Sequence, residues 1–244
     1  MHNGIPENVL IFSGGMDSAT LLYYLLNREE MVQPLTFEYG SKHNYMENQA
    51  VAHVLRMASE IYGEDVVLPG IYVSLGFLGE LFQSSLLKNG SKIPHGHYES
   101  ENMKSTVVPN RNMIMLSVAI GLAESQKMDC VVFGAHGGDH AIYPDCREEF
   151  VKSLDKTSQL ATFRKIKVSA PFIGMTKANI ASMGHNLHVP YELTYSCYEG
   201  GEVHCGLCPT CGERREAFFK AGIKDPTVYA VSWEETKRIC KIVG

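Results

Sequence analysis

A polar turn between two apolar runs carries the residues whose types and spacing best suit phosphate chemistry. The turn, residues 13–18, has the sequence Ser-Gly-Gly-Met-Asp-Ser, and apolar runs flank it at residues 9–12 and 19–26. This pattern is typical of a buried strand, a tight turn and the start of a helix. Gly14 and Gly15 allow the backbone to turn sharply and to approach a ligand closely. Because the first turn of a helix offers free N–H groups and the positive end of its dipole, the turn predicts a phosphate site.

The side chains of the turn sharpen this prediction. Ser13 and Ser18 add hydroxyl donors, and Asp17 is expected to orient the loop or to hold a metal ion. An ordinary strand-to-helix turn is the alternative, since Gly, Ser and Asp are common there. No Gly-Lys-Ser/Thr follows, so this is not a Walker A loop. It resembles instead the pyrophosphate-binding loop of the N-type ATP pyrophosphatases, which implies attack on the α-phosphorus of ATP, with pyrophosphate leaving into the loop.

Four cysteines within fifteen residues form a second cluster of reactive side chains: Cys197, Cys205, Cys208 and Cys211. Four thiolates at this spacing suit one tetrahedral Zn²⁺ ion, and a site filled by four protein ligands is structural rather than catalytic. An Fe–S cluster is the main alternative. We expect His204 to be a neighbour of the site rather than a ligand.

Three further polar stretches lie after predicted strands or before a predicted helix, at residues 37–43, 108–112 and 139–147. Taken singly, each stretch also has an interpretation without function, as solvated charges, the start of a helix or a turn. Beside a phosphate loop, Arg111 could neutralise phosphate charge. Asp139 and Asp145 could bind a purine-like edge, because a carboxylate accepts two parallel N–H bonds. Tyr143 could stack on a planar ring.

The elements that must position these residues alternate along the chain. Five β-like runs cover residues 9–12, 33–38, 66–73, 130–133 and 165–169. Helical patterns cover residues 18–28, 44–62, 77–87, 110–125, 147–161 and 177–184. The alternation predicts an α/β fold, a Rossmann-like, doubly wound and mostly parallel five-stranded sheet with helices on both faces. Ligands bind beyond the carboxyl ends of such strands, which is where the turn at residues 13–18 lies.

We expect two regions: an ATP pyrophosphatase domain at residues 1–190, and a helical, zinc-binding C-terminal region at residues 191–244 packed on it. Residues 88–106 are polar and weakly patterned. They predict either a long mobile loop that acts as a lid or a disordered connection.

Composition narrows the function classes. The chain has 244 residues, a formal net charge of −5 and no dense Lys/Arg run, so direct nucleic-acid binding is not expected. No signal peptide or membrane span is recognisable, so we expect a cytoplasmic protein. Its seven cysteines are then expected to bind metal or to pack rather than to form disulfides.

Together the motifs resemble the 7-cyano-7-deazaguanine synthase family of queuosine biosynthesis. The strings that carry the resemblance lie at residues 12–18, 37–43, 108–112, 143–150, 196–200 and 204–211. The most specific are Tyr-Pro-Asp-Cys-Arg at residues 143–147 and the four cysteines after it. The resemblance covers residues 9–219 and implies the adenine-nucleotide α-hydrolase-like form of the predicted fold.

The resemblance implies a ligase reaction. The carboxylate of 7-carboxy-7-deazaguanine attacks ATP and becomes an acyl-adenylate, and ammonia then displaces AMP to give the amide. A second ATP activates the amide oxygen, and loss of AMP gives the nitrile. Mg²⁺ would neutralise the phosphates, with Asp17 as a candidate ligand. The resemblance also implies a homodimer, and free ammonium is the expected nitrogen source because no glutaminase domain is attached.

The same resemblance assigns residues to sites. The ATP site comprises Phe12, Ser13, Gly14, Gly15, Met16, Asp17, Ser18, Arg111 and Lys177. The deazapurine site comprises Asp139, Tyr143, Asp145 and Arg147. The zinc ligands are Cys197, Cys205, Cys208 and Cys211.

The sequence departs from the family pattern at three places. Glu38 stands where the family usually has Asp, and Asn110 stands where it has Gly. Asn tolerates a left-handed backbone, so we expect the turn at residue 110 to survive. Residues 136–142 also differ from the typical bacterial form, close to the expected substrate.

These departures leave alternatives open. One is a related enzyme that stops at the amide. A second is a tRNA-thiolating enzyme, for which Cys146 is the candidate sulfur carrier. A third is a zinc-ribbon module that binds nucleic acid or protein and consumes no ATP.

Overall fold

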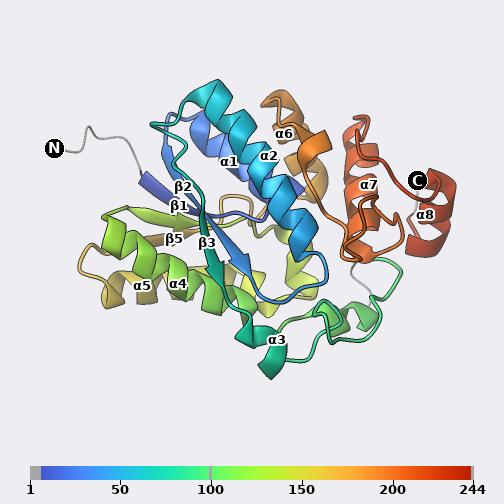
Figure 1. Cartoon of the computed structure of the whole chain (residues 1–244), viewed down its shortest axis with the longest axis horizontal. Coiled ribbons are helices and arrows are strands. Elements are labelled where there is room, and N and C mark those ends of the chain that lie inside the picture. Colours follow the sequence, from blue (N-terminus) through green and yellow to red (C-terminus); the bar gives the residue numbers. More distant parts are fainter. Residues whose placement is uncertain (1–6, 99–100, 243–244) are drawn as a thin grey trace.

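The computed structural model describes residues 7–98 and 101–242, which form an α/β fold around one five-stranded sheet (Figure 1). The strands are all parallel and follow the order β3-β2-β1-β4-β5. Their bounds are Glu7–Ile11 for β1, Met31–Glu38 for β2, Ile71–Ser74 for β3, Cys130–Val132 for β4 and Lys167–Ser169 for β5. The predicted fold class is confirmed.

Strand β3 is shorter than the predicted run at residues 66–73. Val67 forms only an isolated bridge with Val32, and the continuous ladder begins at Ile71. Pro69 lies between them and has no N–H to donate, which explains the interruption. The apolar run is therefore real, but its first part pairs at a single point.

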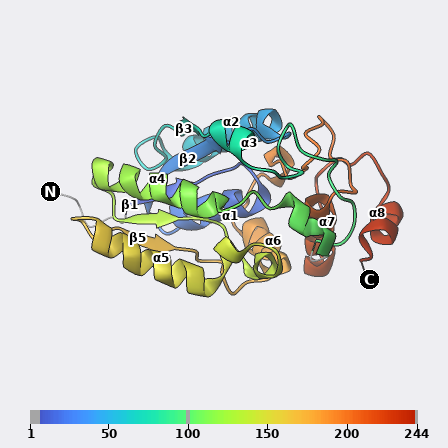
Figure 2. The same ribbon diagram turned by 90° about the horizontal axis from the view of Figure 1, so that it is seen from below.

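Helices cover both faces of the sheet (Figures 1 and 2). One face packs against α1, α2 and α6, and the other against α4 and α5. Their bounds are Met16–Leu26 for α1, Asn44–Tyr62 for α2, Arg111–Gln126 for α4, Glu148–Ala161 for α5 and Lys177–Asn186 for α6. Because a helix that follows a parallel strand runs back along it, these helices begin at the carboxyl edge of the sheet.

The helix predicted at residues 77–87 is much shorter in the structure. Helix α3 spans Phe77–Leu81 and ends where Phe82 adopts an extended conformation. Leu86 and Leu87 are buried in the core from a loop, and the Leu86 carbonyl accepts a hydrogen bond from the Lys42 N–H. Burial of these leucines therefore outweighs local helical preference.

The polar segment at residues 88–106 is packed where the structure describes it. Ile93, Tyr98 and Met103 are buried, and Glu101–Thr106 forms the 3₁₀ helix η1. Residues 99–100 of this predicted lid lie outside the described residues. The alternative of a disordered connection does not fit the described part of the segment, whereas movement as a lid stays a prediction.

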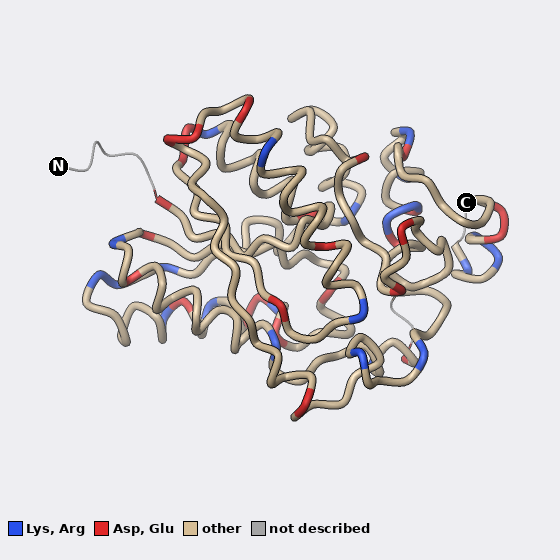
Figure 3. Tube along the Cα trace, viewed as in Figure 1, with Lys and Arg blue, Asp and Glu red and all other residues tan. Residues whose placement is uncertain are grey.

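The C-terminal region adds α7 (Pro209–Ala221) and α8 (Trp233–Cys240), with α7 packed against α6. This contact joins the two predicted regions, whose division at residue 190 stays a prediction. None of the helices in the described ranges has the length and apolarity needed to cross a bilayer. Acidic and basic residues are interspersed along the described chain (Figure 3).

Candidate active site and metal centre

The loop between β1 and α1 turns sharply against α2. Gly14 has a φ of +71°, and a Cβ there would lie 2.7 Å from the backbone nitrogen of Val51. Gly15 is the N-cap of α1, and within residues 7–98 and 101–242 no side-chain hydrogen bond caps this helix. The hydroxyl groups of Ser13 and Ser18 lie 3.2 Å apart beside it. A helix start with uncapped N–H groups and two nearby hydroxyls suits a bound anion.

A cavity of about 240 Å³ at the carboxyl edge of the sheet joins this loop to the other polar stretches. The ends of β1, β2 and β4, the starts of α4 and α6 and the C-terminal region all contribute to its lining. The predicted site residues that line it are Phe12, Ser13, Gly15, Met16, Asp17, Ser18, Arg111, Asp139, Tyr143 and Lys177. The fold therefore gathers residues that are far apart in the sequence.

Lys177 is the centre of a buried charge network beside the loop. Its Nζ lies 2.6 Å from Asp17 Oδ2, 3.0 Å from Glu213 Oε2 and 3.3 Å from His136 Nε2. Burial acts to lower the pKa of Lys177, but the two carboxylates raise it above its usual value. Burial acts to raise the pKa of Asp17, but Lys177 lowers it below its usual value. Both groups are therefore charged at neutral pH.

Asp17 keeps one carboxylate oxygen for a further partner. Its Oδ1 is buried and has no hydrogen-bond partner among the described residues. A buried, unpartnered carboxylate oxygen beside a phosphate loop fits a hard cation such as Mg²⁺.

Aromatic rings line the end of the cavity formed by the residues after β2. The Arg111 guanidinium lies 5.4 Å from the centre of the Tyr39 ring, and its Nη1 donates to the Tyr39 hydroxyl at 3.2 Å. The Tyr198 ring lies against the imidazole of His43, with 5.3 Å between the ring centres. This end suits a planar ring, and the loop end suits phosphates.

Asp139 and Tyr143 are already held by hydrogen bonds. Asp139 Oδ1 accepts from the Tyr98 hydroxyl at 2.9 Å, and Oδ2 accepts from the His136 N–H at 3.1 Å. The Tyr143 hydroxyl lies 2.9 Å from the Thr106 hydroxyl. Both side chains line the cavity in fixed positions.

The remaining predicted substrate residues have other partners. Asp145 Oδ2 accepts from the Asn112 N–H at 2.9 Å, in the first turn of α4. Arg147 Nε donates to the His140 carbonyl at 3.0 Å. Among the described lining residues, neither Asp145 nor Arg147 appears, and Gly14 is absent as well. The geometry gives Asp145 a role in capping α4, and its contact with a purine edge stays a prediction.

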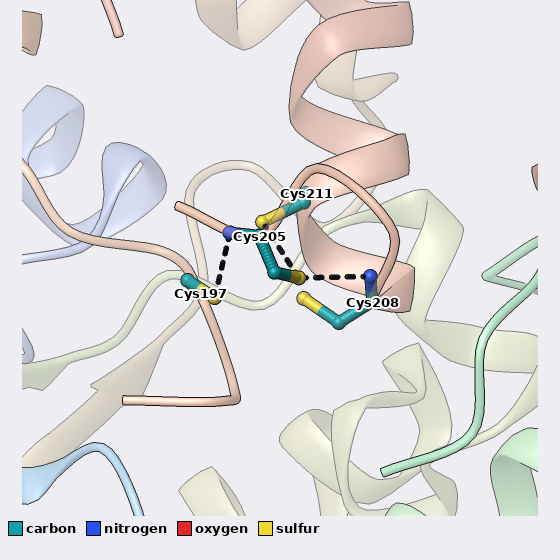
Figure 4. Close-up of side chains that lie close together, drawn as sticks. All are labelled: Cys197, Cys205, Cys208 and Cys211. Carbon is teal, nitrogen blue, oxygen red and sulfur yellow. Dashed lines mark hydrogen bonds between the residues drawn. The ribbon is translucent and has the colours of Figure 1, made fainter. Parts of the chain in front are cut away.

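The four predicted cysteine ligands come together in one cluster (Figure 4). Their sulfur atoms all lie within 4.8 Å of one another, and those of Cys205 and Cys211 are 3.9 Å apart. Tetrahedral Zn–S bonds of about 2.3 Å would place sulfurs about 3.8 Å apart. Backbone N–H groups of Cys205 and Cys208 point at cluster sulfurs, as is common for thiolate ligands. The cluster could hold a metal ion.

His204 lies beside this cluster, as predicted, with its Nε2 in use. That atom accepts a hydrogen bond from the Ser196 N–H at 3.0 Å, and the ring packs against Tyr195. The imidazole therefore positions the loop that carries Cys197.

Helix α7 connects the cysteine cluster to the cavity. Cys208 is its N-cap and Cys211 lies in its first turn, two residues before Glu213 and three before Arg214. The fully buried Arg214 donates to the Thr194 hydroxyl at 2.7 Å and also lines the cavity. Fixing the start of α7 therefore fixes two charged residues of the site.

The chain matches a known protein family over most of its length. The family described as "Queuosine biosynthesis protein QueC" matches residues 7–222. The chain belongs to this family.

Individual relatives agree with the assignment. A protein named 7-cyano-7-deazaguanine synthase from Porphyromonas gingivalis is 46% identical over 223 residues, which is 91% of this chain and 97% of that protein. A protein of the same name from Desulfotalea psychrophila is 45% identical over 225 residues, covering 92% of this chain and 99% of that protein.

A solved structure shares the fold at low sequence identity. The chain aligns with a 4-thiouridine synthetase, crystallised as an RNA complex with bound ATP, at a TM-score of 0.51 and 19% identity. The alignment covers 96% of this chain but spans only half, 50%, of that structure. This likeness concerns the fold alone.

The structure adds cavity residues that the motifs did not identify. They include Glu47, Tyr98, Tyr198 and Arg214 in the cavity, and His136 and Glu213 around Lys177. Glu213 could have been suspected, because it lies two residues after Cys211, the last cysteine of the cluster, in a region expected to be helical. Glu47 carried no such signal, since it is one of several polar residues in the first turns of α2.

Proposed function

We propose that this chain converts 7-carboxy-7-deazaguanine and ammonia to 7-cyano-7-deazaguanine with consumption of ATP. The observation that carries the proposal is 46% identity to a 7-cyano-7-deazaguanine synthase over 91% of the chain. The cavity supports it, because a phosphate loop and an aromatic end lie in one space.

The reaction proceeds in two activations. A carboxylate oxygen of the substrate attacks the α-phosphorus of ATP, and pyrophosphate leaves. Ammonia adds to the acyl carbon, AMP leaves with the C–O electron pair, and a proton is released, which gives the amide. The amide oxygen attacks the α-phosphorus of a second ATP, pyrophosphate leaves and the nitrogen loses a proton. AMP then leaves with the C–O electron pair and the nitrogen loses its second proton, which forms the C≡N bond. Each AMP turns an oxygen into a leaving group.

The residues of the cavity divide this work. The first turn of α1, with Ser13 and Ser18, binds the departing pyrophosphate through N–H and hydroxyl donors. Lys177 and Arg111 neutralise charge that develops on the phosphates. Asp17 would hold Mg²⁺ through its unpartnered oxygen, and that ion would supply further charge neutralisation.

The proposal also includes a bound metal ion, the oligomeric state and the location of the protein. The cysteine cluster binds one structural zinc ion, because its sulfur spacing suits tetrahedral coordination. A homodimer, a cytoplasmic location, free ammonium as nitrogen source and no direct nucleic-acid contact follow from the resemblance and from the composition.

Cys146 argues against the tRNA-thiolating alternative. Its thiol lines the cavity, but burial raises the pKa well above the usual range of a cysteine. A sulfur carrier needs an accessible thiolate, so this site is a poor one for it.

The test is an assay with purified protein, 7-carboxy-7-deazaguanine, ammonium, Mg²⁺ and ATP, followed by mass spectrometry. We expect the nitrile with two AMP per product. Accumulated amide with one AMP would keep the first half of the reaction and contradict nitrile formation. No AMP from folded, metal-loaded protein would contradict the adenylating function altogether.

A further inference from the structure

Three carboxylates line the cavity in the described residues: Asp17, Glu47 and Asp139. Asp17 is bound to Lys177 at 2.6 Å, and both oxygens of Asp139 accept hydrogen bonds. Glu47 differs, because its carboxylate accepts no hydrogen bond from the described part of the chain; its near neighbour is His43 Nε2, 3.6 Å from Oε1. Its side chain is only 19% exposed. A mostly buried carboxylate that faces a cavity without donors calls for donors from a ligand.

The surroundings of Glu47 indicate which kind of ligand supplies them. His43 and Tyr198 stack beside it, and Arg111 and Tyr39 complete the same end of the cavity. Rings and a guanidinium plane favour a flat heterocycle.

Hydrogen-bond chemistry separates the two heterocycles of the reaction. The guanine-type edge of 7-deazaguanine presents a ring N1–H and a 2-amino N–H side by side, so one carboxylate accepts both. The edge of adenine pairs its amino group with a ring-nitrogen lone pair, which a carboxylate repels. Burial raises the pKa of the Glu47 carboxyl, and His43 and Arg111 act to lower it. In its ionised form Glu47 favours the deazaguanine over the adenine of ATP.

We propose that the Glu47 carboxylate binds the donor edge of the deazaguanine, accepting N1–H and the 2-amino group, and so determines substrate specificity. This inference rests on the proposed function. It gives to Glu47 the part that sequence patterns assigned to Asp145. Glu47 acts by binding and takes no part in the transfer of AMP.

The experiment compares two ligands on two proteins. Wild type and Glu47→Gln are assayed with 7-carboxy-7-deazaguanine and with its analogue that lacks the 2-amino group, and kcat/KM is measured for each. We expect wild type to prefer the full substrate by about 10- to 100-fold, the usual effect of a charged hydrogen bond. Glu47→Gln should lose most of this preference, because its amide N–H₂ opposes a donor, and should keep the KM for ATP within about twofold.

The matched control is Glu60→Gln, the same change on the same helix. Glu60 is 55% exposed and forms an ion pair with Arg56 on the same helix, so this variant should keep the full preference. Thermal unfolding checks that all variants fold. Glu47→Asp, which keeps the charge but withdraws it by one methylene, gives a second measurement and should show an intermediate preference.

The possible outcomes distinguish a failure of the Glu47 assignment from a failure of the proposed function. A Glu47→Gln enzyme that still prefers the 2-amino substrate, or one whose defect lies in the KM for ATP, would overturn the assignment. An inactive wild type would contradict the proposed function instead. In that case equilibrium binding of the same two ligands still tests Glu47, since equal affinities for wild type would overturn the inference.

Discussion

At the scale of single residues, the site depends on a lysine that balances two carboxylates in a buried place. Lys177 is the one cation within 4 Å of both Asp17 and Glu213 in the described chain. Removing one member of a buried ion pair leaves an uncompensated charge, which costs far more than an exposed pair contributes. The lysine therefore stabilises the folded site, in addition to the phosphate contact that we propose for it.

Replacing Lys177 by Met should lower the free energy of unfolding by about 3–5 kcal/mol at neutral pH. Without the lysine, burial raises the pKa of Asp17 above its usual value, so protonation relieves the unpaired charge. The difference in free energy of unfolding between wild type and variant should therefore shrink as the pH falls through the range in which carboxylates titrate. Urea unfolding of both proteins at several pH values measures this difference. A difference that does not change with pH would contradict the electrostatic explanation.

Gly14 carries a second residue-scale prediction. An alanine there would adopt a left-handed φ of +71° and place its Cβ 2.7 Å from Val51 N. We expect Gly14→Ala to cost at least about 1–2 kcal/mol and to raise the KM for ATP, because the loop must shift. Gly121→Ala in α4 is the control, since its Cβ would meet nothing within 4 Å. That variant should gain about 0.5–1 kcal/mol, and an equal effect of the two changes would refute the close-approach argument.

At the scale of elements, the start of α4 is built by residues from two parts of the chain. Asn110 precedes the helix with φ 56° and ψ 22°, so the left-handed turn expected from this departure is confirmed. Its own side chain makes no cap. Asp145 supplies the missing acceptor for Asn112 N–H, and Arg111 between them points into the cavity. The Tyr-Pro-Asp-Cys-Arg motif thus positions Arg111 from a distance.

Asp145→Ala should therefore weaken α4 by about 1 kcal/mol, as the loss of an N-cap acceptor does. It should also raise the KM for ATP, because Arg111 loses its fixed position. Asp145→Asn keeps one acceptor oxygen, so it should retain most of the stability of α4 and most of the affinity for ATP. If the alanine variant instead lost only discrimination between deazapurines, Asp145 would be a substrate residue, as the sequence first indicated.

At the scale of the whole molecule, the cysteine cluster links the C-terminal region to the rest of the fold. It fixes the start of α7, α7 packs on α6, and both helices deliver charged residues to the cavity. Binding free energy at such a cluster is also folding free energy. Loss of the cluster should therefore also disturb the positions of the cavity residues, although most of the cavity is built by other elements.

Removing the metal should lower both stability and turnover. We expect one zinc per chain by elemental analysis, and a strong chelator should reduce Tm and activity until zinc is restored. Cys208→Ser should act like the chelator. Cys130→Ser lies outside the cluster and should retain zinc and activity. Iron with acid-labile sulfide would identify an Fe–S cluster instead, and full activity after complete metal removal would contradict the structural role.

The fold could be predicted from the sequence because its signals are local and repeated. Apolar runs alternated with amphipathic ones, and five strands in the structure overlap the five predicted runs. The failures have local causes that only packing shows. Pro69 interrupts the predicted run at residues 66–73, so that β3 begins only at Ile71. Buried leucines at 86 and 87 hold a loop where a helix was expected.

The sequence by itself determined the parts of the site that lie within one short stretch. The phosphate loop and the cysteine cluster each need only a few neighbouring residues, so their spacing carries their chemistry. The tertiary structure decided which distant side chains share the cavity. Lys177 meets Asp17 across 160 positions. Glu47 accepts no hydrogen bond from the described residues and has His43 as its neighbour, while Asp145 is used by α4. The reason is physical: a carboxylate binds a ligand or caps a helix according to which donors surround it, and those donors come from elements that only folding brings together.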